Sequence, residues 1–290
     1  MFTGALIAIV TPFRNGKVDE KAFGDLIEWQ IANGTSGIVP CGTTGESATL
    51  THQEHHRVVE LTVEVVNRRI PVIAGAGSNS TAEAVSLTKH AKQAGADGAL
   101  LITPYYNKPT QEGLYRHYKT IAESVDLPQI LYNIPGRTGV NMLPSTVARL
   151  CGFQNIVGIK EGSGSVQQAS EIASTCGDRM TVLAGDDALT LPMMAVGGKG
   201  VISVTSNIVP SEMAQLVKAF LGGHIEEARR IHFALSPLFT ALFYETNPIP
   251  VKTALGMMGK IDPELRLPLC AMATEAKGQL AQALKDAGLV

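Results

Sequence analysis

The chain has 290 residues, of which 45% are hydrophobic and 17% are charged, and its formal net charge is −2. A chain of this length and composition folds into one α/β barrel or into two smaller domains, with a substantial core. With this small net charge, nothing in the composition suggests a nucleic-acid partner, and we predict none.

From residue 5 onward, short apolar runs alternate with amphipathic helical patterns. The strand-like runs are Ala5–Thr11, Gly37–Cys41, Pro71–Ala76, Gly98–Pro104, Gln129–Ile134, Ile156–Lys160, Met180–Ala184 and Gly200–Thr205. The helical patterns are Glu20–Ala32, Gln53–Asn67, Thr81–Ala94, Gln111–Ser124, Pro144–Leu150, Val166–Thr175, Leu189–Val196 and Pro210–Leu221. This alternation indicates a parallel sheet, and the number of strands favours a closed (β/α)8 TIM barrel over an open doubly wound sheet.

The rest of the chain is helical in pattern, over Ile225–Tyr244, Ile249–Met258 and Ala271–Ala287. No low-complexity linker separates these patterns from the barrel. We therefore predict a barrel of residues 1–222 followed by a C-terminal helical extension of residues 223–290.

The first residues and the cysteines both favour a cytoplasmic protein. Residues 1–10 lack a basic segment and lead directly into a turn at Pro12, so we expect no secretory signal. No apolar run approaches the ~20 residues of a membrane span, so we expect no membrane partner. The 4 cysteines are scattered without a CxxC pair, which favours reduced thiols.

A lysine stands at the end of the sixth apolar run. Strand periodicity places Ile156, Gly158 and Lys160 on one face, where Gly158 would leave room for a substrate. Burial lowers the pKa of a lysine ammonium and leaves a free amine that can attack a carbonyl to form a Schiff base. The alternative is a strand-end lysine that extends its ammonium into water.

Other candidate groups follow neighbouring strands, at the barrel end where active sites form. The turn Gly42–Glu46 could bind a carboxylate or a phosphate, or it is an ordinary Gly-rich connection. Tyr132 and Tyr106 could relay protons, or they only cover the core. Arg137 could hold a carboxylate in a bidentate pair, or it is a solvated surface residue.

Two further patterns do not complete a site. Gly75–Ser80 lacks the third glycine of a dinucleotide fingerprint, which argues against an oxidoreductase. His52, His55 and His56 do not have metal-ligand spacing, so we predict no metal. A barrel that has kept the fold without catalysis is a further alternative, which the joint presence of lysine, tyrosines, threonines and arginine disfavours.

Three motifs in order, Gly42–Glu46, residues 132–139 and Gly158–Glu161, resemble those of the pyruvate-dependent Schiff-base class I aldolases, the superfamily of N-acetylneuraminate lyase. Within it, the whole chain is most similar to the dihydrodipicolinate synthase family. The resemblance implies a lyase of diaminopimelate and lysine biosynthesis. Lys160 would form an imine with pyruvate, whose enamine attacks the aldehyde of L-aspartate 4-semialdehyde, and the adduct would cyclise to 4-hydroxy-tetrahydrodipicolinate.

The resemblance also implies roles for single residues. Tyr132, Thr43 and Tyr106 would form a proton relay, with Tyr106 reaching in from a neighbouring subunit of a homotetramer built as a dimer of dimers. Thr44 would hold the pyruvate carboxylate and Arg137 that of the semialdehyde. Gly185 and Ile202 would line the pocket. No cofactor and no catalytic metal are implied.

Arg137 separates this family from a close relative. N-acetylneuraminate lyases usually carry Ser-Thr where this chain has Thr43-Thr44, and they lack the arginine. A second cation suits an aldehyde that carries a carboxylate, so Arg137 favours the semialdehyde over a sugar. Other aldolases and hydratases of the superfamily remain alternatives.

A second match concerns regulation. Members inhibited by L-lysine bind it at the tight-dimer interface, through residues that match Ser47, Ala48, His52, His55, Asn79, Glu83 and Tyr105. We therefore expect inhibition by L-lysine, with Glu83 and Asn79 contacting its α-amino end.

Overall fold

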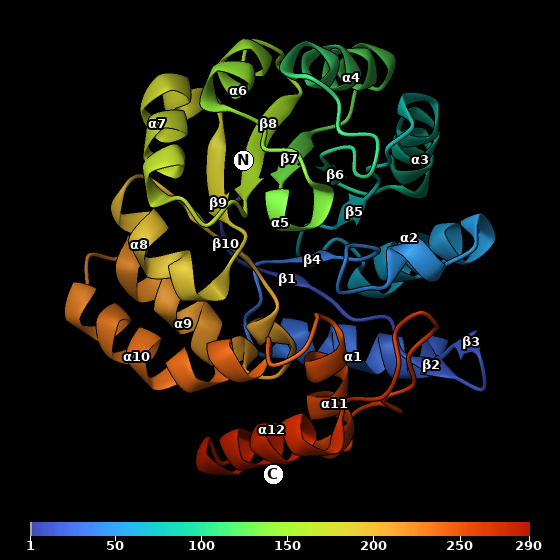
Figure 1. Cartoon of the computed structure of the whole chain (residues 1–290), viewed down its shortest axis with the longest axis vertical. Helices are drawn as coiled ribbons and strands as arrows, with labels where there is room; N and C mark the ends of the chain where they lie inside the picture. Colours follow the sequence, from blue (N-terminus) through green and yellow to red (C-terminus); the bar gives the residue numbers. More distant parts are fainter. Residues whose placement is uncertain (1) are drawn as a thin grey trace.

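The computed structural model describes residues 2–290, in which eight parallel strands form a ring surrounded by helices (Figure 1). The strands of the ring are β1 (Gly4–Ala8), β4 (Gly37–Val39), β5 (Ile73–Gly75), β6 (Gly98–Ile102), β7 (Gln129–Asn133), β8 (Ile156–Glu161), β9 (Thr181–Ala184) and β10 (Gly200–Ser203). They pair in the order β4-β1-β10-β9-β8-β7-β6-β5. A parallel bridge between Ile38 and Val72 joins the two ends. The predicted (β/α)8 TIM barrel is confirmed.

The helices around the ring are α1 (Glu20–Ala32), α2 (His52–Val66), α3 (Thr81–Ala94), α4 (Gln111–Ser124), α6 (Pro144–Leu150), α7 (Val166–Cys176), α8 (Thr190–Ala195) and α9 (Pro210–Leu221). Local side chains fix several of their ends. Thr51 and Glu54 form a capping box at the start of α2, Ser80 caps α3, and α3 ends at Gly95 with a φ of 88°. These helices therefore begin within a residue of their predicted starts.

Short turns of helix complete the connections: α5 (Pro135–Thr138), η1 (Ser47–Thr49), η2 (Gly177–Arg179), η3 (Asp187–Leu189) and η4 (Thr205–Asn207). A hairpin of β2 (Phe13–Arg14) and β3 (Lys17–Val18) was not predicted. Its turn residues Asn15 and Gly16 have φ values of 54° and 76°, which is the geometry that an Asn-Gly pair favours in a two-residue hairpin.

The C-terminal extension consists of α10 (Ile225–Ala241), α11 (Ile249–Met257) and α12 (Thr274–Asp286). In Figure 1 these helices lie together along one side of the barrel, in orange and red, and α10 packs against α9. The division of the chain at residues 222 and 223 stays a prediction. Within residues 2–290, none of the helices has both the length and the apolar character to cross a membrane.

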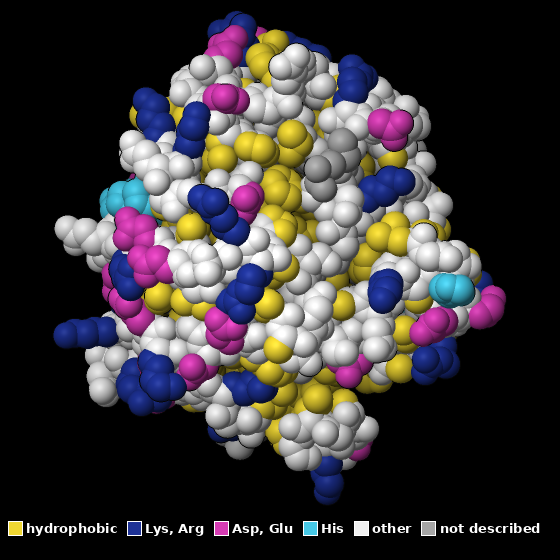
Figure 2. All heavy atoms as spheres, turned by 180° about the vertical axis from the view of Figure 1, so that it is seen from behind, with side chains coloured by type: hydrophobic (Ala, Val, Ile, Leu, Met, Phe, Trp, Pro, Cys, Tyr) yellow, Lys and Arg dark blue, Asp and Glu magenta, His cyan; other side chains and the backbone are white. Residues whose placement is uncertain are grey.

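The core has two layers, one inside the ring and one between the ring and its helices. The inner layer is formed by Leu6, Ala8, Val39, Ile73, Leu100, Ile130, Tyr132, Leu183 and Ile202. Outside, positive and negative side chains are interspersed on the face that Figure 2 shows, and hydrophobic side chains gather near its centre.

Strand β8 departs from simple alternation. Gln129 of β7 pairs with Ile156, but the next residue, Ile130, pairs with Gly158, so β8 carries one extra residue at this point. Ile156 therefore lies in the outer layer, and the prediction that it shares a face with Lys160 is wrong. The space beside Gly158 is also not free for a substrate, because a Cβ there would lie 3.0 Å from the carbonyl oxygen of Thr181.

Candidate active site

A small cavity of about 50 Å³ lies at the carboxyl end of the barrel strands. Most of the predicted catalytic and substrate-binding residues line it together: Thr43, Thr44, Tyr132, Arg137, Lys160 and Gly185. They come from different strand ends and their following loops, so only closure of the barrel brings them to one place. A larger cavity of about 490 Å³ adjoins it and shares Thr43, Tyr132 and Arg137 as lining residues.

Lys160 is the second-last residue of β8 and is almost completely buried, 4% exposed. Its Nζ lies 4.4 Å from the centre of the Tyr132 ring. Burial lowers the pKa of Lys160 from 10.5 to about 8, while the negative charge of Asp187 opposes this effect and the positive charge of Arg137 adds to it. The alternative of an ammonium that reaches water does not hold, and a substantial share of free amine is present near neutral pH.

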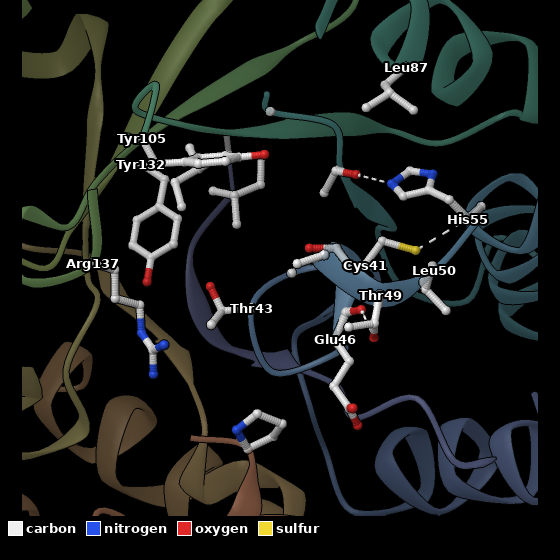
Figure 3. Close-up of a pocket in the computed structure, with 18 of the residues that line it drawn as sticks. Cys41, Thr43, Glu46, Thr49, Leu50, His55, Leu87, Tyr105, Tyr132 and Arg137 are labelled. Carbon is white, nitrogen blue, oxygen red and sulfur yellow. Dashed lines mark hydrogen bonds between the residues drawn. The ribbon is translucent and has the colours of Figure 1, made fainter. Parts of the chain in front are cut away.

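Tyr132 stands on β7 directly beside Lys160, because these two residues pair across the strands. In Figure 3 its hydroxyl points toward Thr43, with Arg137 on the other side. Burial raises the pKa of Tyr132, and the charge of Arg137 and a hydrogen bond with the Thr43 side chain only partly offset this. The phenol therefore keeps its proton at neutral pH and can pass it along a chain of hydroxyls.

Thr44 is oriented by a residue that sequence analysis did not identify. Asn247, in the loop before α11, donates from Nδ2 to the Thr44 Oγ1 at 3.0 Å. Because this hydroxyl oxygen already accepts a hydrogen bond, its own proton is free to be donated to an anion. The N–H groups of Gly45, Glu46 and Ser47 bond within the turn, so an anion held there would be bound by the residues before them.

Arg137 lies on α5, and its guanidinium is anchored to the same loop. Its Nη2 donates to the carbonyl oxygen of Asn247 at 3.1 Å and lies 3.4 Å from the Thr246 hydroxyl. The side chain is exposed to solvent on one side and lines both cavities on the other. An anchored guanidinium at a cavity mouth is suited to bind a carboxylate.

The remaining predicted residues lie in different places. A Cβ at Gly185 would meet the carbonyl oxygen of Glu161 at 2.9 Å, so a larger residue would not fit this wall of the cavity. Ile202 is fully buried in the inner layer and is not among the lining residues. Tyr106 has a left-handed φ of 71° and is 89% exposed, away from the cavity of its own chain.

Asp187 is a second residue to which sequence analysis assigned no role. It is buried at the start of η3. Its Oδ2 accepts hydrogen bonds from the N–H of Val204 at 3.0 Å and from the N–H and hydroxyl of Thr205, each at 2.9 Å. Its position in Gly185-Asp186-Asp187 after a predicted strand was the only signal. Burial raises the pKa of Asp187, and hydrogen bonds including those from Thr205 and Val204 oppose this. In its charged form the carboxylate raises the pKa of Lys160.

The residues matched to an L-lysine site gather around the larger cavity. Those that line it are Ser47, Ala48, His52, His55, Glu83 and Tyr105. Asn79 stands beside them, donating from Nδ2 to the carbonyl oxygen of Tyr105 at 3.1 Å. Glu83 lies 3.3 Å from Nε2 of His52 and accepts a hydrogen bond from Ser78.

The histidines of α2 interact with protein groups. The ring of His55 lies 2.8 Å from the carbonyl oxygen of Gly75, and burial lowers its pKa to about 4. His56 stacks on His90 with ring centres 3.7 Å apart. Within residues 2–290, no three His, Cys, Asp or Glu side chains come together in a way that could hold a metal ion.

Comparison with known proteins identifies the family. The model of the dihydrodipicolinate synthetase family matches residues 1–287. The chain belongs to this family. It is 62% identical over 290 residues to a 4-hydroxy-tetrahydrodipicolinate synthase of Thermodesulfovibrio yellowstonii, with 100% of both chains covered. Its activity is that of a 4-hydroxy-tetrahydrodipicolinate synthase, a lyase of lysine biosynthesis, so the oxidoreductase and non-catalytic alternatives are excluded.

Two solved structures of similar proteins carry ligands. One is the chloride-inhibited dihydrodipicolinate synthase of Acinetobacter baumannii complexed with pyruvate, with a TM-score of 0.98, 48% identity and 100% of both chains covered. The other is the enzyme of Cyanidioschyzon merolae with lysine bound, with a TM-score of 0.96, 43% identity, and coverage of 100% of this chain and 99% of that one.

Proposed function

We propose that Lys160 is the nucleophile of the synthase reaction. Its neutral amine adds to C2 of pyruvate, and loss of water gives a protonated imine. Loss of a proton from C3 gives an enamine, whose C3 forms the new carbon–carbon bond with the aldehyde carbon of L-aspartate 4-semialdehyde while the aldehyde oxygen takes up a proton. The amino group of the adduct then attacks C2, closes the ring and releases the lysine amine.

The observation that carries this assignment is a desolvated amine at the end of β8, facing hydroxyl groups in a small cavity. A lysine ammonium that is buried this deeply is costly, and natural cores avoid it unless the group has a use. The low pKa supplies the free amine, and the cavity supplies hydroxyls for the proton transfers.

Two separate groups would bind the two carboxylates. The carboxylate of pyruvate would be held by the Thr44 hydroxyl and by the backbone of its turn. The Thr44 proton is free for this, because Asn247 donates to the hydroxyl oxygen. The guanidinium of Arg137, held at the cavity mouth by the Asn247 carbonyl, would hold that of the semialdehyde. A sugar aldehyde has no carboxylate for Arg137, so we expect no turnover of N-acetylmannosamine.

Tyr132 and Thr43 would carry protons between the reacting atoms and solvent, and we propose that Tyr106 of a neighbouring subunit completes the relay. Tyr106 is 89% exposed and has a left-handed backbone conformation. Both features are unfavourable in an isolated chain, and both are explained if the ring is covered by another subunit in an assembly. The proposed assembly is the homotetramer built as a dimer of dimers.

Mixing two defective variants tests the role of Tyr106. Lys160→Ala and Tyr106→Phe chains would each be poorly active alone. In a mixed dimer, the Tyr106→Phe chain would keep its lysine and receive an intact Tyr106 from its partner, so activity should return. If mixing restores no activity, Tyr106 does not act across the interface.

L-lysine would bind in the larger cavity as a feedback inhibitor. Glu83 would supply a negative charge for its α-amino group and Asn79 an amide oxygen, while the side chains of His55 and Ser47, which line the same cavity, would bind its carboxylate. Isothermal titration with L-lysine and with L-norleucine, which has the same backbone without the ε-amine, measures this directly. Equal binding of the two would contradict a site built for lysine.

Turnover tests the function as a whole. The chain should consume L-aspartate 4-semialdehyde only when pyruvate is present, and Lys160→Ala should lose this activity while keeping its circular dichroism spectrum. Consumption of N-acetylmannosamine in place of the semialdehyde would overturn the role given to Arg137. Full activity of the Lys160→Ala variant would place the nucleophile elsewhere.

A further inference from the structure

A second buried lysine lies outside the proposed chemistry. Lys252, on α11 of the C-terminal extension, is 0% exposed, and its Nζ lies 2.6 Å from Oε1 of Glu46. The same ammonium donates to the carbonyl oxygen of Thr11 at 2.9 Å and stands 4.3 Å from the centre of the Phe13 ring. Burial lowers the pKa of Lys252, and the Glu46 carboxylate opposes this. The charge is thus placed between three fixed partners.

Glu46 is the residue that closes the turn Gly42–Glu46. It has a left-handed φ of 53°, which is unfavourable for a residue with a side chain unless its surroundings fix it. Its N–H donates to the Thr43 carbonyl oxygen at 3.1 Å. Its Oε2 accepts from the N–H of Arg266 at 3.2 Å, so both carboxylate oxygens are held by the C-terminal extension. In Figure 3 the Glu46 carboxylate points away from the Thr43 hydroxyl.

Lys252 also reaches the turn from its other side. Thr11, whose carbonyl oxygen binds the ammonium, donates from its hydroxyl to the Gly45 carbonyl oxygen at 2.7 Å. One buried ammonium is therefore connected to the two residues that follow Thr44, through Thr11 to Gly45 and directly to Glu46. Lys252 therefore holds the last two residues of the turn, while the first three, Gly42, Thr43 and Thr44, line the small cavity.

We propose that Lys252 is a positioning residue that holds the turn Gly42–Glu46 in the conformation that binds the carboxylate of pyruvate. This inference rests on the proposed role of the turn. Without Lys252, Oε1 of Glu46 loses its partner, and the left-handed residue that ends the turn is less firmly fixed. The turn then samples conformations in which the Thr44 hydroxyl and the neighbouring N–H groups do not converge on an anion. The semialdehyde carboxylate, held by Arg137 on another strand end, is not affected in the same way.

The test compares the binding of pyruvate with the binding of the semialdehyde. Lys252→Met keeps an unbranched side chain that is one atom shorter and removes the charge. We expect the KM for pyruvate, and the pyruvate concentration that gives half-maximal reductive trapping with cyanoborohydride, each to rise about tenfold or more. The KM for the semialdehyde should change by less than about threefold, as expected for a substitution that does not act on the semialdehyde-binding group.

Two further variants separate positioning from general destabilisation. The double variant Glu46→Gln/Lys252→Met contains no unpaired buried charge and should regain thermal stability over Lys252→Met, yet keep the raised half-saturation for pyruvate. Leu255→Ala, on the same helix and fully buried, is the matched control: it should lower the melting temperature and leave the half-saturation for pyruvate unchanged.

The outcomes are distinct. A lower melting temperature with an unchanged half-saturation in both Lys252 variants, or an equal rise in Leu255→Ala, would overturn the positioning role and leave Lys252 a purely structural residue. If the unsubstituted chain itself is not trapped with pyruvate, the proposed function fails instead.

Discussion

Replacing Arg137 by methionine and Asp187 by asparagine should move the pH dependence of imine formation in opposite directions. Burial lowers the pKa of Lys160 from 10.5 to about 8, the positive charge of Arg137 lowers it further, and the negative charge of Asp187 raises it. This change in pKa means that the site destabilises the charged amine by about 3 kcal/mol relative to the neutral amine. At pH 7 about a tenth of the amine is then neutral, compared with about three parts in ten thousand for an exposed lysine.

The assay is the rate of reductive trapping by pyruvate and cyanoborohydride between about pH 6 and pH 9.5, the range around the pKa, with intact-mass detection. Pyruvate is kept below saturation, so that the rate follows the fraction of free amine. The unsubstituted chain should give a curve with its midpoint near pH 8. Arg137→Met should move the midpoint up and Asp187→Asn should move it down, and below the midpoint each pH unit of movement changes the rate about tenfold.

Arg229→Met is a suitable control, because it removes a surface arginine that pairs with Glu226 on α10. It should leave the midpoint in place. A midpoint near the ordinary pKa of lysine, or movement of both site variants in the same direction, would refute the electrostatic reasoning.

Four further results are expected. Lys160→Met should raise the melting temperature at pH 7. The pKa of Lys160 in the folded state is lowered to about 8, so the cost of the buried charge is fully present below that pH and fades as pH rises toward 10.5. A lower melting temperature would mean that the ammonium is well stabilised. Arg137→Ala should raise the KM for the semialdehyde about a hundredfold, while trapping with pyruvate at a pH above the midpoint stays intact. Loss of both at that pH would mean a common defect. Glu83→Gln should raise the L-lysine concentration for half-maximal inhibition about tenfold in a steady-state assay, and an unchanged value would exclude Glu83 from the site. Glu54→Gln should lower the melting temperature at pH 7 but not at pH 2. The hydrogen bond with Arg266 lowers the pKa of Glu54 from 4.5 to about 2, so the contribution of the Glu54 carboxylate to stability is lost as pH falls between these values. An equal change in melting temperature at both pH values would refute the ion pair as the cause of the change.

Much of the fold could be predicted because each element carries its own local signals. The helix α3 begins at the Ser80 cap and ends at Gly95, and both residues act within one turn of the backbone they terminate. The β2–β3 hairpin was missed although Asn15-Gly16 is a strong turn signal, because its strands are only two residues long and show no periodicity. The extra residue in β8 has no local signal, since it depends on how β7 and β8 pair.

The same distinction applies to the site. Lys160, Tyr132 and Arg137 stand at strand ends, where the barrel itself predicts chemistry, and the structure brings them around one cavity. Asn247 and Lys252 could not be found in this way, because each acts on the turn after β4 from more than 200 residues away, with separations of 203 and 206 residues. Only the packing of the C-terminal extension against the barrel makes these contacts.

The most direct test of the account is the identity of the residue that pyruvate modifies. After reduction with borohydride in the presence of pyruvate, the chain is digested and each lysine-containing peptide is weighed by mass spectrometry. We expect one modified residue, Lys160, and no modification in Lys160→Ala. Modification of another lysine, such as the buried Lys252, or of none, would contradict the assignment of Lys160 as the Schiff-base residue.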